Sequence, residues 1–353
     1  MKIKKISAQL YICFILLMAV TVLGGCGATG EKNNTATGFD CIKELDYEGA
    51  IAAFEQGIEA GEDKRSIKRG EGIAYLALGQ YDFSISAFEE ALSLSNGILN
   101  GMDYDISYYL ATALYKKGSI EEAIGIYDSI LALKPNEVPA LYLRGLLYSE
   151  LDNLDMAMEN FNKAISIAPN DYDMLIEIYT VLEQNGYKET GQTYLKSAIE
   201  SDSKRMTNYE KGQISFYLED YESARTYLEK AKDENGAEAV LFLGKTYEIL
   251  GDTNYAISVY SSFINSGADS AEVLNQLGNC RMSIGDYEGA LQAFEQAINI
   301  EDNGMMQTLK FNEIVACEYT GDFEKAKNLM SAYIKAYPND EEAKREYTFL
   351  KTR

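Results

Sequence analysis

The chain contains no histidine and no tryptophan among its 353 residues. Without histidine, neither a Ser-His-Asp nor a Cys-His nucleophile system can be built from this chain, and zinc sites that need imidazole are excluded as well. Only carboxylate, lysine, tyrosine or cysteine chemistry remains for catalysis. We therefore expect no metal site, no cofactor and no catalytic residue.

Basic residues are also scarce. The chain has 32 Lys and Arg against 55 Asp and Glu, a formal net charge of −23, and no basic run follows the first five residues. Nucleic-acid binding depends on clustered basic side chains that displace counterions from phosphates. Nucleic acid is therefore excluded as a partner, and the acidity itself indicates a soluble surface. A preference for basic or cation-bearing partners is the alternative.

Cysteine occurs five times, and no two cysteines form a C-x-x-C pair that would indicate a zinc or redox motif. Cys41, Cys280 and Cys317 each fall among apolar positions of expected helices. This placement predicts buried free thiols. A disulfide between Cys280 and Cys317 is the alternative.

The first residues have the order of a secretory signal. MKIKK supplies positive charge, and a run of 14 apolar residues follows as far as Leu23. A helix that spans a bilayer needs about 20 apolar residues, so residues 1–25 are predicted to be a signal peptide. An uncleaved signal anchor is the alternative.

The segment Leu23-Gly24-Gly25-Cys26 resembles the lipobox of bacterial lipoproteins. The resemblance implies a diacylglyceryl group on the Cys26 thiol and cleavage just before that residue. Two acyl chains hold a protein stably on a bilayer. We therefore expect a lipid-anchored, extracytoplasmic protein on the cell membrane, with residues 26–36 as lipidated cysteine and flexible tether. Whether the cell has one membrane or two stays open.

A structural repeat fills the remainder of the chain, and DYEGAIAAFEQGI at Asp46 returns as DYEGALQAFEQAI at Asp286. The small residue of this segment recurs nine times, at intervals of 32 to 39 residues, and a large apolar residue follows each copy four positions later. Residues four apart share one face of a helix. The small positions are Ala50, Ser84, Ala123, Ala157, Gly191, Ala224, Ala256, Ala290 and Ala326.

A second helix is expected before each of these, because another small residue recurs twelve positions earlier, often as glycine. Glycine costs about 1 kcal/mol relative to alanine inside a helix, so its recurrence indicates close approach of two helices. Turns containing glycine separate the helices, as in LGQY at 78–81 and IGDY at 284–287. Pro135, Pro169 and Pro338 follow second helices, and Pro139 lies near a helix start.

These units resemble the tetratricopeptide repeat (TPR), most clearly at 271–303 and 140–171. The resemblance implies an all-α, right-handed superhelical solenoid over residues 37–353, with about nine helix-turn-helix units and a C-terminal capping helix at 340–352. The match is weakest in the first repeat, with its short first helix, in the fifth repeat at Tyr179 and in the ninth repeat at Ile314. A longer connection is expected near 96–103.

In this family the first helices line a concave groove, so residues that are not used for packing there are candidate ligand contacts. The surface they predict is rich in aromatic and amide groups, which suit extended peptides or glycans. The basic set with which some family members bind a peptide carboxylate is missing. The candidates are Tyr108, Thr112, Tyr115, Tyr142, Tyr209, Gln213, Phe216, Lys245, Asn275, Asn279 and Asn312.

The expected function is a non-catalytic, membrane-anchored scaffold that binds a protein or peptide. A narrower alternative is a cell-envelope assembly factor, like the repeat lipoproteins that help outer-membrane proteins or pilus secretins assemble. A carboxylate-based enzyme acting on glycans is the remaining alternative. The acidic pairs such as Glu89 and Glu90 fall on outer helix faces, which indicates a solvated surface and not an acid/base couple.

Overall fold

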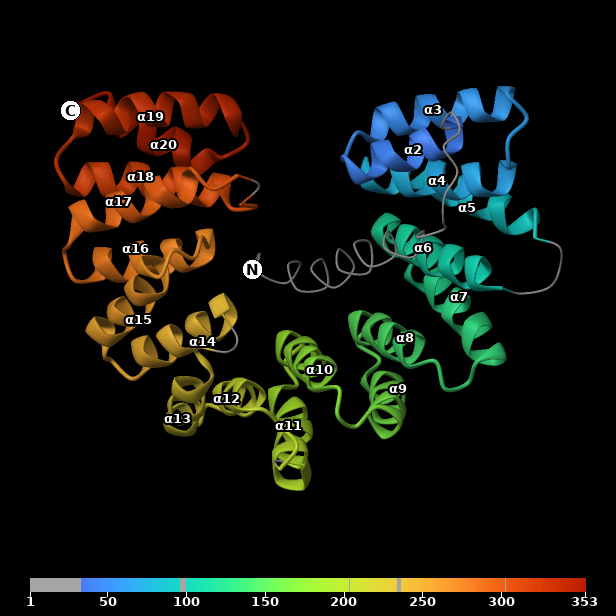
Figure 1. Cartoon of the computed structure of the whole chain (residues 1–353), viewed down its shortest axis with the longest axis horizontal. Helices are drawn as coiled ribbons and strands as arrows, with labels where there is room; N and C mark the ends of the chain where they lie inside the picture. Colours follow the sequence, from blue (N-terminus) through green and yellow to red (C-terminus); the bar gives the residue numbers. More distant parts are fainter. Residues whose placement is uncertain (1–32, 96–99, 203, 234–235, 302) are drawn as a thin grey trace. The chain divides into compact units, whose positions relative to one another are not determined.

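The structure is a computed structural model that describes residues 33–95, 100–202, 204–233, 236–301 and 303–353. The predicted signal peptide and Cys26 lie outside these residues. The first described helix begins at Asn34, so the last three residues of the predicted tether are helical. Among the described residues, all regular secondary structure is helical, in nineteen helices labelled α2 to α20 (Figure 1).

Eighteen of these helices form nine consecutive pairs, as the repeat predicts. The first helices are α2 (Asn34–Lys43), α4 (Lys64–Ala77), α6 (Gly101–Lys117), α8 (Val138–Glu150), α10 (Tyr172–Gln184), α12 (Asn208–Tyr217), α14 (Gly236–Ile249), α16 (Ala271–Ser283) and α18 (Met306–Tyr319). The second helices are α3 (Tyr47–Glu59), α5 (Tyr81–Ser93), α7 (Ile120–Leu133), α9 (Leu154–Ile167), α11 (Lys188–Asp202), α13 (Tyr221–Ala231), α15 (Thr253–Asn265), α17 (Tyr287–Ile298) and α19 (Phe323–Ala336). The remaining helix is α20 (Glu341–Leu350).

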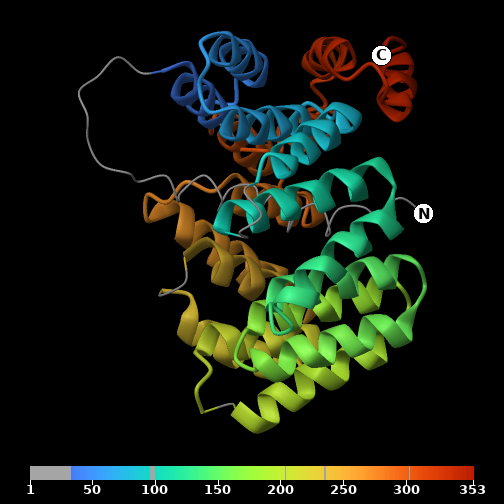
Figure 2. The same ribbon diagram turned by 90° about the vertical axis from the view of Figure 1, so that its right-hand side faces the viewer.

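The chain divides into two compact units, one ending at Tyr194 and the other beginning at Leu195, within α11. In unit 1 each helix from α2 to α9 packs on the next, α10 packs on α8, and the first helices α2, α4 and α6 also contact one another in sequence. In unit 2 the same relation joins α12, α14 and α16. Figure 2 shows the helix pairs of unit 1 from a second direction, following the colours from blue to green.

The recurring small residues are explained by contacts inside each pair. Six first helices carry glycine, and a Cβ atom on any of these glycines would lie only 2.1–2.6 Å from the bulky residue of the second helix. The helices therefore approach so closely that a side chain fills the space above the glycine. The pairs are Gly38–Phe54, Gly72–Phe88, Gly145–Phe161, Gly212–Leu228, Gly244–Tyr260 and Gly278–Phe294.

Two of the three weakly matching repeats, the fifth and the ninth, solve the same packing problem differently. In the fifth repeat the large residue is on the first helix, and a Cβ on Gly191 would lie 3.1 Å from the Cα of Tyr179. In the ninth repeat, Ile314 and Met330 are both buried in one apolar cluster. Methionine adapts to irregular gaps, so it can pack beside a first helix that lacks the small residue.

The predicted turns and helix ends are confirmed. The glycines of the two expected turns, Gly79 and Gly285, have φ of 73° and 82°, in the left-handed region that ends a helix. After Gly285, Asp286 begins the next helix and accepts a hydrogen bond from the Gly289 amide at 3.0 Å, whereas Gln80, after Gly79, makes no such side-chain cap. Three repeats place a non-glycine residue at this left-handed position: Leu45, Asp152 and Glu219.

Helix α20 covers the last pair, as expected of a capping helix. Ala343 and Leu350 are fully buried and join a cluster with Ile314, Cys317 and Met330. The apolar face of α19 is therefore not left open to water. Within the described ranges, none of the helices combines the length and the apolar character needed to span a bilayer.

Candidate binding site on the first helices

All eleven predicted contact residues lie on first helices, four in unit 1 and seven in unit 2. Their exposure differs widely. Thr112, Tyr142 and Asn275 are buried, with 9%, 3% and 5% of their surface exposed, so they pack inside the helix layers. Asn279 and Lys245 are exposed, and the other six are half-buried.

In unit 1, Tyr108 packs against Tyr127 of α7, with ring centroids 6.0 Å apart. Its hydroxyl is buried and has no hydrogen-bond partner among the described residues. Burial, and to a smaller extent the charge of Glu137, raises the pKa of Tyr108 above its usual value. The hydroxyl is therefore protonated at neutral pH and is a buried hydrogen-bond donor without a partner among the described residues.

One turn further along α6, Thr112 and Tyr115 line a small cavity between α6, α8 and α10. Its volume is about 30 Å³, and Leu146, Val181 and Gln184 contribute to its walls. A space of this size holds one water molecule. Burial raises the pKa of Tyr115 to about 12, and its hydroxyl lies 3.5 Å from the Glu150 carboxylate.

Glu177 on α10 is a residue that the sequence analysis missed. Burial raises the pKa of its carboxyl to about 8, a hydrogen bond with Tyr142 lowers it, and Asp173 and Asp171 raise it again. The Oε2 atom has no hydrogen-bond partner among the described residues. At neutral pH this carboxyl is mostly protonated, so it can donate a hydrogen bond as well as accept one. In sequence it resembles any solvated glutamate, and no spacing signal distinguishes it.

In unit 2, four aromatic rings gather on the first helices α12 and α14. The ring of Phe242 lies 6.3 Å from Tyr209, 5.3 Å from Phe216 and 5.9 Å from Tyr217, in edge-to-face geometry. Tyr209 also donates a hydrogen bond to Glu238 at 3.1 Å. Tyr209 and Phe216 were predicted as contacts, whereas Phe242, the centre of the cluster, was not, because it occupies no repeated position.

Amide and basic groups extend this surface along unit 2. Asn312 of α18 donates a hydrogen bond to Asn275 of α16 at 2.9 Å, so these two predicted residues contact each other. The Oε1 atom of Gln213 is buried without a partner in the described part of the chain. Lys245 is exposed.

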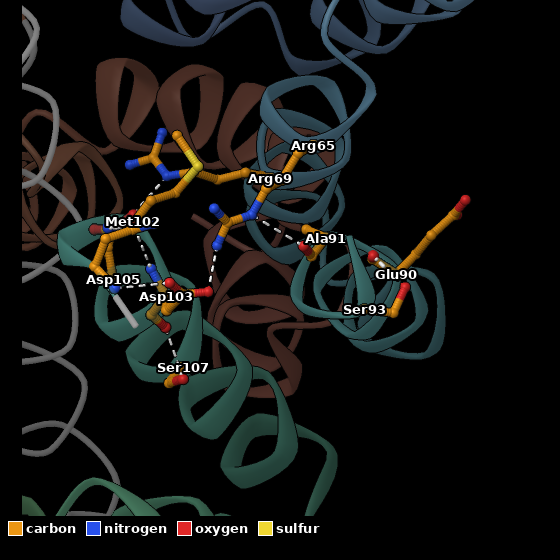
Figure 3. A network of polar contacts seen from close by, with 10 residues as sticks. Arg65, Arg69, Glu90, Ala91, Ser93, Met102, Asp103, Asp105 and Ser107 are labelled. Carbon is orange, nitrogen blue, oxygen red and sulfur yellow. Dashed lines mark hydrogen bonds and ion pairs between the residues drawn. The ribbon is translucent and has the colours of Figure 1, made fainter. Parts of the chain in front are cut away.

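Helix α4 begins with KRSIKR, a basic segment that the sequence analysis overlooked, and both of its arginines are paired within unit 1 (Figure 3). Arg65 donates to the carboxylate of Asp103, which is 2% exposed, and to the Ala91 carbonyl at 3.2 Å. Arg69 pairs with Asp105. These arginines hold α6 against α4 next to the longer connection expected near 96–103. They are therefore not free to bind an anionic ligand.

No group of three or more metal-ligating side chains occurs among the described residues. Cys41, Cys280 and Cys317 are free thiols, but only Cys280 and Cys317 are buried as predicted, whereas Cys41 is half-buried. Burial raises the pKa of Cys280 to about 12 and that of Cys317 to about 11. Such thiols stay protonated and unreactive at neutral pH.

Family models of the tetratricopeptide repeat match residues 43–97, 69–138, 138–171, 207–236 and 271–303, more than half of the chain in total. The chain belongs to the tetratricopeptide repeat family. The TPR units first recognised by their spacing are thus confirmed at the level of the family, and the fold is that of a helical solenoid.

Individual relatives of this TPR chain are distant. The BBSome complex member BBS4 of Bos taurus is 21% identical over 271 residues, which are 75% of this chain and 50% of that protein. The TPR repeat-containing protein MJ1428 of Methanocaldococcus jannaschii is 24% identical over 255 residues, 71% of this chain and 41% of that protein. The chain thus spans half or less of the length of these curated relatives.

Two solved structures are also similar to this chain. A crystal structure of MamA is 24% identical, covers 48% of this chain and 95% of its own, and has a TM-score of 0.39. A tetratricopeptide repeat protein from Parabacteroides merdae is 14% identical, covers 72% of this chain and 98% of its own, and has a TM-score of 0.46.

Proposed function

We propose that this chain is a lipid-anchored, extracytoplasmic TPR protein that holds a protein or peptide partner on its first helices and has no catalytic activity of its own. One observation supports the binding face above all. The predicted contacts Tyr108 and Gln213 each bring a buried polar atom without a partner to the first helices of the described chain. Buried polar groups normally have partners, so a peptide that reached these two atoms on binding would supply the missing hydrogen bonds.

The aromatic cluster around Phe242 supports the same proposal. Tyrosine and phenylalanine rings offer large contact areas at low cost in conformational entropy, and they are enriched at protein interfaces. Because these rings already pack against one another, little ordering is needed when a partner binds.

Photocrosslinking in cells tests the binding face. A photoreactive phenylalanine analogue at Lys245, on first helix α14, is expected to capture a defined partner. The matched control is the same analogue at Ser258, an exposed position on second helix α15 of the same pair. Equal capture at both positions would move the binding site away from the first helices.

The anchor rests on the order of charge, apolar run and Leu23-Gly24-Gly25-Cys26 in the sequence. Cys26→Ser is expected to abolish incorporation of labelled palmitate and to release the protein from membranes. Cys13→Ser is the matched control, because that thiol lies inside the predicted signal and is expected to leave labelling unchanged. A Cys26→Ser protein that remains in the membrane fraction would instead indicate an uncleaved signal anchor.

A further inference from the structure

The capping helix α20 is held to the last helix pair, α18 and α19, by contacts at both of its ends. At its start, Asp340 accepts hydrogen bonds from the Ala343 amide at 3.0 Å and from the Tyr333 hydroxyl of α19 at 2.8 Å. Just beyond its last turn, the Arg353 guanidinium lies 5.7 Å from the centre of the Phe323 ring of α19. The pKa of Asp340 is lowered, chiefly by the Ala343 amide, and burial raises the pKa of Tyr333, so these contacts persist across neutral pH.

Between these two ends, Glu346 of α20 meets Glu318 of α18. The Oε1 atom of Glu318 is buried and has no hydrogen-bond partner among the described residues. Burial, and then the charge of Glu346 together with a hydrogen bond between the two side chains, raises the pKa of the Glu318 carboxyl to about 7. Two carboxyls at such close range are stable together while one of them carries a proton.

Within the described part of the chain, no basic side chain forms an ion pair with either carboxyl. Lys325 of α19 is shared between Glu295 at 2.6 Å and Glu313 at 3.9 Å. On α20 itself, Lys344 pairs with Glu341 at 2.6 Å. The basic residues of α16 to α20 are Arg281, Lys310, Lys325, Lys327, Lys335, Lys344 and Arg345.

The other acidic groups around the pair do not change its chemistry. Burial and Glu346 alone account for the raised pKa of Glu318. The remaining carboxylates of α18 to α20 and of their connections are Glu313, Asp322, Glu324, Asp340, Glu341 and Glu342.

Helix α20 buries little surface. It has ten residues, Glu341–Leu350, of which only Ala343 and Leu350 are buried. An element with so few buried apolar contacts opens locally at a lower free energy than the packed helix pairs behind it. A repulsive contact within its interface is therefore enough to shift its docking equilibrium.

We propose that α20 is a pH-sensitive cap, docked on the last helix pair while Glu318 carries a proton and released as Glu318 ionises beside Glu346. Protonated Glu318 donates a hydrogen bond to the Glu346 carboxylate, whereas ionised Glu318 places two negative charges across the interface. In the released helix the Glu318 carboxyl is solvated and titrates near its ordinary value of 4.5. Docking is therefore strongest below pH 4.5 and weakens as the pH rises to about 7, because the released state loses the proton first. Release uncovers the apolar face to which Ile314 and Met330 belong.

Amide hydrogen exchange of the full chain in detergent, followed by mass spectrometry, tests this proposal. Exchange rates in Glu341–Leu350, divided by the intrinsic rates, give the opening equilibrium of α20 at each pH. We expect this opening constant to rise by about tenfold between pH 5.5 and pH 8, a modest value because Glu318 is only partly buried. The amides of α17, Tyr287–Ile298, are the internal reference in the same unit and should not follow this change.

Three variants separate the carboxyl pair from other effects of pH. Glu318→Gln keeps the shape of the side chain without its charge and should abolish the pH dependence of α20 opening. Glu346→Gln removes the facing charge but leaves the burial of Glu318, so it should reduce the dependence. Glu342→Gln, at an exposed position of α20, is the charge-matched control and should behave like the parent protein.

The proposal is overturned if α20 of the parent protein opens equally at pH 5.5 and pH 8. The same pH dependence in Glu318→Gln and in the parent protein would also overturn it. Equal acceleration of exchange in α17 and α20 would show unfolding of the whole unit in place of release of the cap.

Discussion

The side-chain amide of Asn312 donates a hydrogen bond to the Oδ1 atom of Asn275, at 2.9 Å, and so joins first helices α18 and α16 across 37 residues of sequence. Each asparagine was predicted on its own as a ligand contact. Their pairing gives them a structural role, because Asn275 is only 5% exposed and Asn312 supplies a hydrogen-bond donor to its side-chain carbonyl. The neighbouring Asn279 is exposed and remains a candidate contact.

Asn312→Ala should therefore destabilise unit 2. Removal of the donor leaves a buried acceptor unsatisfied, which costs about 1–3 kcal/mol. Asn279→Ala, on the exposed side of α16, should change the free energy of unfolding by less than about 0.5 kcal/mol. Urea denaturation of both variants measures the difference, and equal stabilities would show that the Asn312–Asn275 bond contributes nothing.

The duplicated segment provides a second test, at the residue before each copy. Leu45, before Asp46, has φ of 62°, whereas Gly285, before Asp286, has φ of 82°. The left-handed conformation costs a residue with a Cβ about 1–2 kcal/mol, so Leu45→Gly should stabilise the protein despite the greater freedom of glycine in the unfolded chain. Leu45 is 69% exposed, so little packing is lost.

The matched reverse change is Gly285→Leu, which should destabilise by a similar amount. Thermal unfolding of both variants checks the prediction. If the two substitutions shifted the melting temperature in the same direction, the turn conformation would not explain the glycine preference.

The repeat period predicted much of this architecture. Spacing alone located the nine helix pairs, the glycine turns and the glycine–bulky contacts, because close packing of two helices demands a small residue at a fixed position. It did not locate the left-handed Leu45 and Glu219, since local sequence there gives no turn signal. It also could not give burial depth within a helix layer, and so Tyr142 and Asn275 were expected at the surface. Glu177 and Phe242 were missed because their roles arise from neighbours in other repeats.

The close approach of helices within a pair can be tested at Gly244. A Cβ there would lie 2.1 Å from Cζ of Tyr260, a ring that is fully buried. Gly244→Ala should destabilise by about 1–3 kcal/mol, since overpacking outweighs the gain in helix propensity. Gly125→Ala is the control, because Gly125 lies inside α7 with no atom near its Cβ position, and this change should stabilise by up to about 1 kcal/mol. Chemical denaturation that gave both variants the same sign would contradict this account.

The buried ion pair between Arg65 and Asp103 should contribute far more to the stability of the fold than the exposed ion pairs do. Asp103 also accepts a hydrogen bond from the Asn100 amide at 2.8 Å, so its carboxylate both begins α6 and neutralises Arg65. Asp103→Asn leaves a largely buried arginine without its counter-charge and should cost about 3 kcal/mol. Asp82→Asn breaks a pair with Lys117 in which Asp82 is 81% exposed, and should cost less than about 1 kcal/mol. Urea midpoints of the two variants compare them directly, and similar losses would refute the structural role of the buried pair.

Stability should depend on pH through Glu177. Burial raises its pKa from 4.5 to about 8 in the folded chain, whereas in the unfolded chain it titrates near its ordinary value. Below about pH 4.5 the carboxyl is protonated in both states, and its burial carries no charge penalty. As the pH rises from 4.5 to 8, the unfolded state releases the proton first, so this contribution to stability is lost across that window.

Glu177→Gln keeps a neutral, hydrogen-bonding side chain and should remove this loss, so that the variant is more stable than the parent protein at pH 8 and close to it at pH 4.5. Melting temperatures measured across this range check the prediction, with Glu183→Gln on the exposed side of α10 as the control. A parallel pH profile for the parent protein and Glu177→Gln would show that Glu177 is ionised in the folded state at neutral pH.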